Sequence, residues 1–132
     1  MYKLGLIGFP LSHSVSKKYF DLKFKNEHII NFTYSLYELS ELNQFKKLIN
    51  DKHIIGLNIT SPYKNKIINH LSKLDKIAQN TKSVNTVFIN PLNHETTGFN
   101  TDYIGFKELI PKNGLDLYKK ALILGSGGVS KT

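Results

Sequence analysis

Lys64 and Asp102 are the two residues of this 132-residue chain whose side chains are best suited to move a proton. An amine and a carboxylate that meet in one site can act as a general acid and base. Both residues also have ordinary uses, because most lysines lie solvated on the surface and an aspartate often caps a helix. The residues around them decide between these interpretations.

Hydroxyl and amide side chains accompany this pair in short polar segments, each at or near the end of an apolar stretch. They are Ser14, Ser16, Asn58, Thr60, Asn85 and Thr101. Some could serve structure alone, since Ser caps helices and a buried Asn can connect hydrogen bonds. Together with one Lys and one Asp, and without the spacing of metal ligands, they form a set suited to a polyhydroxylated carboxylic acid. Two serines at the start of a helix would donate to its carboxylate.

A glycine-rich turn follows the apolar residues 121–124. The residues that would contact a cofactor there are Gly125, Ser126, Gly127, Gly128 and Val129. Their spacing fits the dinucleotide-binding fingerprint, with Ser130 where Gly or Ala is usual. A P-loop fits less well, because Ser130 stands at its second required glycine, and a turn without a ligand is a third interpretation. The residue that separates NAD from NADP would follow beyond Thr132.

The composition excludes several classes of function. The chain is 40% hydrophobic and 21% charged, which is ordinary for a folded domain, and it has no cysteine for a disulfide or thiol chemistry. Its net charge of +8 comes from scattered lysines without an arginine, whereas nucleic-acid recognition relies on clustered charge and arginine forks. No apolar run reaches the about 18 residues of a membrane span, and the first residues look like a strand rather than a signal peptide. We therefore expect a cytoplasmic protein with a small-molecule substrate, no nucleic acid, no membrane and no metal, and a homodimer stays open.

The elements that must position the polar residues alternate between strands and helices. Strands are predicted over residues 2–8, 32–36, 54–59, 83–90, 96–100 and 121–124, and helices over residues 15–26, 39–49, 62–71, 74–79 and 102–109. This order predicts an α/β fold, a three-layer sandwich with a mainly parallel mixed sheet, because the turn at residues 91–94 makes a hairpin. Residues 1–112 would form one domain, and residues 113–132 would be the first strand and glycine-rich turn of a truncated Rossmann domain. Ligands of such sheets bind beyond the carboxyl ends of the strands, where the polar segments lie.

Lys64 has an unusual predicted position. Pro62 is expected to be the first residue of the helix over residues 62–71, which places Lys64 in its first turn. A cation there opposes the helix dipole, so solubility alone is a poor reason for a lysine at this point.

Four motifs, in this order, resemble the N-terminal substrate-binding domain of the shikimate dehydrogenase family. The matching residues are Gly8-x-Pro10-Leu11-x-His13-Ser14-x-Ser16, Asn58-Ile59-Thr60-x-Pro62-Tyr63-Lys64, Val84-Asn85-Thr86 and Gly98-x-Asn100-Thr101-Asp102. In the family a glycine-rich NADP turn follows these motifs, as it does here. The resemblance spans the whole chain but only about the first half of a family member. Departures at residues 17–19 and at Ser61 touch none of the expected contacts.

The resemblance implies the NADPH-dependent, reversible reduction of 3-dehydroshikimate to shikimate in chorismate and aromatic amino-acid biosynthesis. Lys64 would be the general acid and base, and Asp102 would complete the pair and bind a neighbouring hydroxyl. Ser14 and Ser16 would bind the carboxylate. The ring hydroxyls would be held by Asn58, Thr60, Asn85 and Thr101. Residues 1–112 would be the substrate-binding catalytic domain, and residues 113–132 the start of the NADP-binding domain.

Other functions remain open at this stage. Quinate or quinate/shikimate dehydrogenases act on a ring that differs by one hydroxyl. A non-catalytic shikimate-binding domain is an alternative from another class, and we expect this chain on its own to be inactive. A nucleotide phosphohydrolase comes third and depends on Lys131 in a P-loop role.

Overall fold

A computed structural model describes residues 1–132, with the exception of the side chain of Asp116. The strands are β1 (Tyr2–Gly8), β2 (Phe32–Glu38), β3 (Ile54–Ile59), β4 (Lys73–Leu74), β5 (Thr86–Ile89) and β6 (Thr96–Phe99). The α-helices are α1 (Ser16–Asn26), α2 (Phe45–Leu48), α3 (Lys76–Thr81), α4 (Thr101–Lys112) and α5 (Gly128–Lys131). Short 3-10 helices cover Leu42–Gln44, Lys66–His70 and Leu115–Leu117. Among these described elements no helix is long and apolar enough to cross a membrane.

The strands form one six-stranded mixed sheet in the order β2-β1-β3-β5-β6-β4. β1 runs parallel to both β2 and β3, and β4 runs parallel to β6, whereas β5 is antiparallel to β3 and β6. The carboxyl ends of β1, β3 and β6 therefore meet at the same edge of the sheet as the start of β5. This is the edge at which the polar motifs lie.

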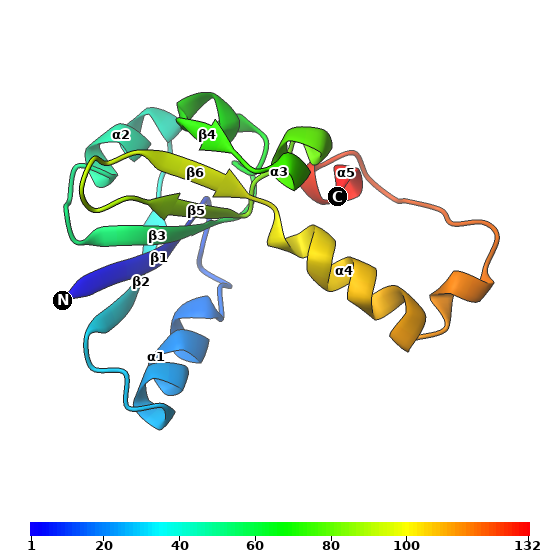
Figure 1. Cartoon of the computed structure of the whole chain (residues 1–132), viewed down its shortest axis with the longest axis horizontal. Helices are drawn as coiled ribbons and strands as arrows, with labels where there is room; N and C mark the ends of the chain where they lie inside the picture. Colours follow the sequence, from blue (N-terminus) through cyan, green and yellow to red (C-terminus); the bar gives the residue numbers. More distant parts are fainter.

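Alternation along the strands sends apolar side chains to both faces of the sheet. Ile7 of β1 faces a large core that includes Phe45 of α2, Ile67 and Ala78 of α3. Leu6 of the same strand faces a second core, where Phe20 and Phe24 of α1 pack. Helices on both faces make the predicted three-layer α/β sandwich, which is confirmed (Figure 1).

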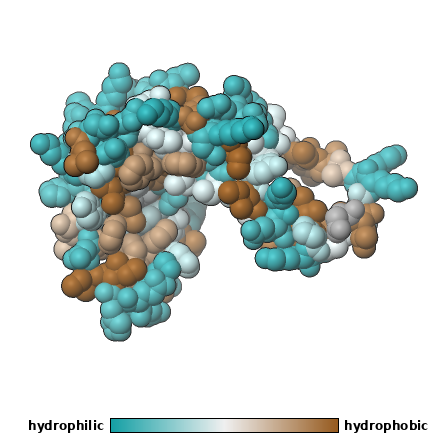
Figure 2. Space-filling view, viewed as in Figure 1, coloured by the Kyte–Doolittle hydropathy of each residue, from teal (hydrophilic) through white to brown (hydrophobic). Residues whose placement is uncertain are grey.

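α4 leaves the sheet edge and extends away from the two cores (Figure 1). Its side chains Ile104, Phe106 and Leu109 are exposed. Apolar side chains gather on this arm and on the segment that returns from it, as Figure 2 shows. α4 continues to Lys112, beyond residue 109 where the predicted helix ends, so it includes Pro111, and the chain turns at Gly114, which has a φ of 65°.

Two predicted elements are wrong. No α-helix begins at Pro62, because residues 61–65 form turns and a 3-10 helix follows at Lys66–His70. Residues 121–124 form no strand, and Leu122 and Leu124 are 84% and 88% exposed. A strand needs a neighbour to pair its backbone groups, and none of the described strands lies beside this segment.

Candidate active site

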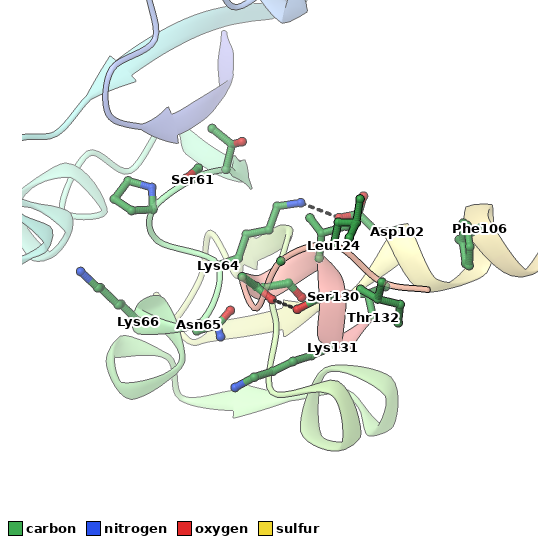
Figure 3. A pocket seen from close by; sticks show the side chains of 17 residues that line it. Ser61, Lys64, Asn65, Lys66, Asp102, Phe106, Leu124, Ser130, Lys131 and Thr132 are labelled. Carbon is green, nitrogen blue, oxygen red and sulfur yellow. Dashed lines mark hydrogen bonds and ion pairs between the residues drawn. The ribbon is translucent and has the colours of Figure 1, made fainter. Parts of the chain in front are cut away.

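The side chains of Lys64 and Asp102 meet at the sheet edge. Lys64 Nζ donates to Asp102 Oδ2 over 2.6 Å, and the two side chains are 17% and 36% exposed (Figure 3). Lys64 follows the turn after β3, and its carbonyl accepts a hydrogen bond of 2.8 Å from the N–H of Val84. Because no α-helix begins at Pro62, the expected opposition between Lys64 and a helix dipole does not apply.

Asp102 does not cap α4, so helix capping, the common structural role of an aspartate in this place, does not account for it. Asn100 is the N-cap, and its side-chain oxygen accepts from the N–H of Tyr103. Asp102 is thereby free to accept from two side chains, Lys64 on Oδ2 and Asn85 on Oδ1, the latter over 2.7 Å. The carboxylate retains lone pairs, and the ammonium retains N–H donors, for a ligand between them.

Asn85 connects the two sides of the site. Its backbone is fixed by strand pairing, because its carbonyl accepts from Ile59 and its N–H donates to Phe99. Its side-chain oxygen accepts from the N–H of Thr101 over 2.9 Å. The sequence predicted Asn85 either as a site residue or as a buried connector of hydrogen bonds. In the structure its side-chain amide contacts Asp102 and Thr101 directly.

Asn58 lies on the α1 face of the sheet, opposite Thr86 in the register of β3 and β5. Its Nδ2 donates to Thr86 Oγ1 over 3.4 Å, and its Oδ1 accepts from the hydroxyl of Tyr34 over 2.8 Å. Burial raises the pKa of Tyr34 to about 12, and the nearby Ser16 hydroxyl opposes part of this shift. The hydroxyl of Tyr34 thus contacts Asn58 and lies near Ser16, one of the two predicted carboxylate-binding serines.

Ser14 and Ser16 lie where α1 begins. Ser16 is the first residue of the helix, and its N–H donates to Ser14 Oγ over 3.3 Å. The N-cap residue is Val15, whose side chain makes no capping bond. Ser14 therefore serves one backbone N–H of the helix start, while its hydroxyl proton and that of Ser16 can point to a ligand.

A cleft of about 860 Å³ separates the Lys64 side of the molecule from the glycine-rich turn (Figure 3). Thr60, Lys64 and Asp102 line one wall, with Phe106 of α4. The other wall is made by residues Ile123, Leu124, Gly125 and 127–132, so the predicted cofactor residues Gly125, Gly127, Gly128 and Val129 face the cleft. Ser126, by contrast, is not among the described residues that line it.

Close packing holds the glycine-rich turn against the substrate side. A Cβ at Gly128 would lie 2.5 Å from Asn65 Oδ1 and 3.0 Å from Lys64 Cβ, so a larger residue does not fit there. The buried side chain of Asn100 donates to Thr132 Oγ1 over 2.9 Å as well as to Thr81. The turn and the catalytic candidates are therefore neighbours in space.

Two residues of the hydrogen-bonded site were not predicted as site residues. Thr86 stands inside a recognised motif, and only the register of β3 against β5 places it beside Asn58. Tyr34 lies on β2, and its hydroxyl reaches Asn58 across β1. The available sequence signal was the alternation along β2, which places Tyr34 on the face of the sheet that α1 covers. This signal is weak because such a tyrosine usually belongs to the core.

Comparison with known proteins identifies the family of this chain. The sequence model of the family described as shikimate dehydrogenase substrate binding domain matches residues 6–87. The chain belongs to this family. A shikimate dehydrogenase (NADP(+)) of Methanococcus maripaludis is 39% identical over 132 residues, which cover 97% of this chain and 46% of that relative.

Solved structures of shikimate dehydrogenases have the same fold. Shikimate dehydrogenase 1 of Peptoclostridium difficile superposes with a TM-score of 0.85 at 34% identity, over 99% of this chain and 50% of that one. The Thermus thermophilus enzyme, solved with NADP(H) and shikimate, gives 0.83 at 28% identity, over 99% and 49%. The chain thus spans about half the length of the shikimate dehydrogenases that it matches.

Proposed function

We propose that this chain is the substrate-binding part of an NADP-dependent shikimate dehydrogenase, which reversibly reduces 3-dehydroshikimate to shikimate in aromatic amino-acid biosynthesis. The observation that carries the proposal is the Lys64 and Asp102 pair, held by Asn85 in a cleft whose opposite wall is the glycine-rich turn. Membership of the shikimate dehydrogenase substrate-binding domain family supports it. The Thermus thermophilus structure is a complex with NADP(H) and shikimate.

Lys64 would act as the general acid of the reduction. Its ammonium donates a proton to the carbonyl oxygen as that oxygen becomes a hydroxyl, and in the reverse direction the amine takes the proton back. Asp102 orients the ammonium through the 2.6 Å contact and accepts a hydrogen bond from the neighbouring ring hydroxyl. When bound, NADPH supplies the hydride for the carbonyl carbon.

The remaining polar residues would hold the substrate in place. Ser14 and Ser16 donate to the carboxylate from the start of α1. The ring hydroxyls are held by Asn58, Thr60, Asn85 and Thr101. Contacts at both ends of the ring set the distance from the carbonyl to Lys64. Holding reacting groups at such a distance lowers the entropic part of the activation barrier.

The glycine-rich turn fits a dinucleotide. Gly125 has a φ of 119°, which favours glycine, and nothing lies within 4 Å of the place where a Cβ would stand at Gly125 or Gly127. The backbone is therefore accessible to a phosphate at these two positions, while Gly128 allows the turn to pack on Asn65. Ser126 and Val129 would complete this contact. Residues 113–132 belong to the cofactor side of the enzyme in this proposal, and residues 1–112 to the substrate side.

Location and assembly are part of the proposal. A cytoplasmic location suits a dehydrogenase that draws on a shared pool of nicotinamide cofactor. The free edge of β2, a seven-residue strand at the end of the sheet, suits pairing with a second copy into a homodimer. Sedimentation at increasing protein concentration tests the dimer, and a constant monomer mass would exclude it.

A chimera tests the catalytic proposal. Residues 1–132 replace the matching half of the Methanococcus maripaludis dehydrogenase, and NADPH formation is followed with shikimate and NADP⁺. We expect turnover that disappears with Asp102→Ala. A chimera that binds NADP⁺ but leaves shikimate unreacted would contradict the proposal.

A further inference from the structure

Tyr34 is a buried residue of β2 that contacts the candidate site through one atom. Its side chain is 2% exposed and stacks on Phe20 of α1, with ring centroids 4.1 Å apart and planes 9° from parallel. Packing of this kind leaves the ring a single position. The hydroxyl at its end donates to Asn58 Oδ1 over 2.8 Å.

This hydrogen bond is the last of a chain of side-chain contacts that sets which way the Asn58 amide faces. A phenol that donates to Oδ1 leaves Nδ2 on the opposite side, and there Nδ2 donates to Thr86 Oγ1 over 3.4 Å. Thr86 Oγ1 in turn donates to Asn85 Oδ1 over 3.1 Å. The direction is imposed at Asn85, because the Asp102 carboxylate there only accepts and the Thr101 N–H only donates, whereas the hydroxyls of Thr86 and Tyr34 can do either.

The same direction of donation continues to the catalytic candidates. With its Oδ1 taken by Thr86 and by the N–H of Thr101, Asn85 presents Nδ2 to Asp102 Oδ1 over 2.7 Å. Asp102 then accepts from Lys64 on its other oxygen. Each side chain thus donates to the next one, from Tyr34 through Asn58, Thr86 and Asn85 to the carboxylate of Asp102.

The phenol keeps its proton over the whole neutral range. Burial raises the pKa of Tyr34 to about 12, so at any pH at which the site would work the hydroxyl keeps the proton that it donates to Asn58.

We propose that Tyr34 is a positioning residue of this site: its hydroxyl holds Asn58 Oδ1 and so keeps the Asn58 amide, whose Nδ2 contacts Thr86, in the position that receives a ring hydroxyl of the substrate. The orientation of the amides is a property of the protein alone. That the receiving ligand is shikimate rests on the proposed function.

The variant Tyr34→Phe keeps the ring and removes the hydroxyl. Tyr37→Phe is the matched control, because Tyr37 is another tyrosine of β2, partly buried, that packs against the other core. The first readout is the NMR resonances of the side-chain amides in the 132-residue chain without ligand. We expect Tyr34→Phe to move the side-chain resonance of Asn58 and to leave that of Asn85, which Asp102 and Thr101 hold, nearly in place, and Tyr37→Phe to move neither. An Asn58 side-chain resonance that stays in place in a folded Tyr34→Phe protein would overturn the proposal.

The second readout is shikimate binding in a double-mutant cycle. Tyr34→Phe should weaken binding about five- to tenfold, the effect of one lost hydrogen bond. In an Asn58→Ala background, the same substitution should weaken binding no further, because the residue through which Tyr34 acts is gone. An equal loss in both backgrounds would show that Tyr34 acts by general packing. If the unaltered chain bound no shikimate, the proposed function would fail, while the ligand-free amide resonances would still decide the role of Tyr34.

Discussion

Asp102 accepts a hydrogen bond of 2.6 Å from Lys64, a residue 38 positions earlier in the chain, while its other oxygen is held by Asn85. The pair is partly shielded from water. Lys64 is attached to the sheet edge by the hydrogen bond between its carbonyl and the N–H of Val84, and Asp102 by its position in the first turn of α4. The ammonium of Lys64 and the carboxylate of Asp102 therefore place a proton donor and an acceptor side by side at the cleft.

Replacing Lys64 with Ala should lower kcat of the chimeric dehydrogenase by about a hundredfold or more, because proton transfer is lost in the transition state. The KM for shikimate should change much less. The measurement is steady-state kinetics, with Lys73→Ala as the control. Lys73 is also paired with a carboxylate, Glu95 at 2.8 Å, but lies on the β4 edge outside the cleft. A higher KM with an unchanged kcat would make Lys64 a binding residue only.

Replacing Ser14 or Ser16 with Ala should weaken shikimate binding by about 1–3 kcal/mol, the range for a hydrogen bond to a charged group. The methyl ester of shikimate lacks the carboxylate charge and should lose less. Calorimetric titration of each variant with both compounds makes the comparison. Equal losses for acid and ester would argue against a carboxylate contact.

Replacing Asn100 with Ala should destabilise the chain by about 1–3 kcal/mol, since it removes a helix cap and leaves buried partners unpaired. Asn100 is 2% exposed and bonds Tyr103, Thr81 and Thr132. The control is Asn113→Ala at the exposed other end of α4. Urea unfolding measures both, and equal midpoints for the two variants would refute the predicted cap.

Stability should fall as pH rises from 10 to 12. The folded-state pKa of Tyr34 is about 12 and its ordinary value is 10, so in this window the unfolded chain loses a proton that the folded chain keeps. The contribution is complete below pH 10. Tyr34→Phe should therefore show a shallower alkaline loss in urea midpoints, although Tyr37, whose pKa burial also raises, retains its own share. Parallel curves for the two proteins would contradict this burial effect.

Local patterns predicted the sheet and most of its strands, because apolar alternation and turn residues act over short distances. Pro62 misled the helix prediction, since a proline that suits a first helical turn equally suits the turn found before Lys66–His70. Residues 121–124 have the composition of a buried strand, but a strand also needs a paired neighbour, which composition does not supply.

The candidate site divides in the same way. Motifs predicted residues such as Lys64, Asn85 and Asp102, and the structure brings these three together. Tyr34 escaped prediction because its contact with Asn58 depends on strand order and register, with β1 between the two strands. Long-range register of this kind is set by packing of the whole sheet rather than by any local pattern.

A titration of the 132-residue chain with shikimate, followed by backbone amide resonances, tests the central claim most directly. The account predicts weak but saturable shifts at Ser14, Ser16, Asn85 and Asp102, because these residues would surround the ligand. The shifts at Asn85 and Asp102 should shrink in Lys64→Ala and persist in Lys73→Ala. Resonances at these four residues that stay unmoved up to millimolar shikimate, or saturable shifts confined to another surface, would contradict the account.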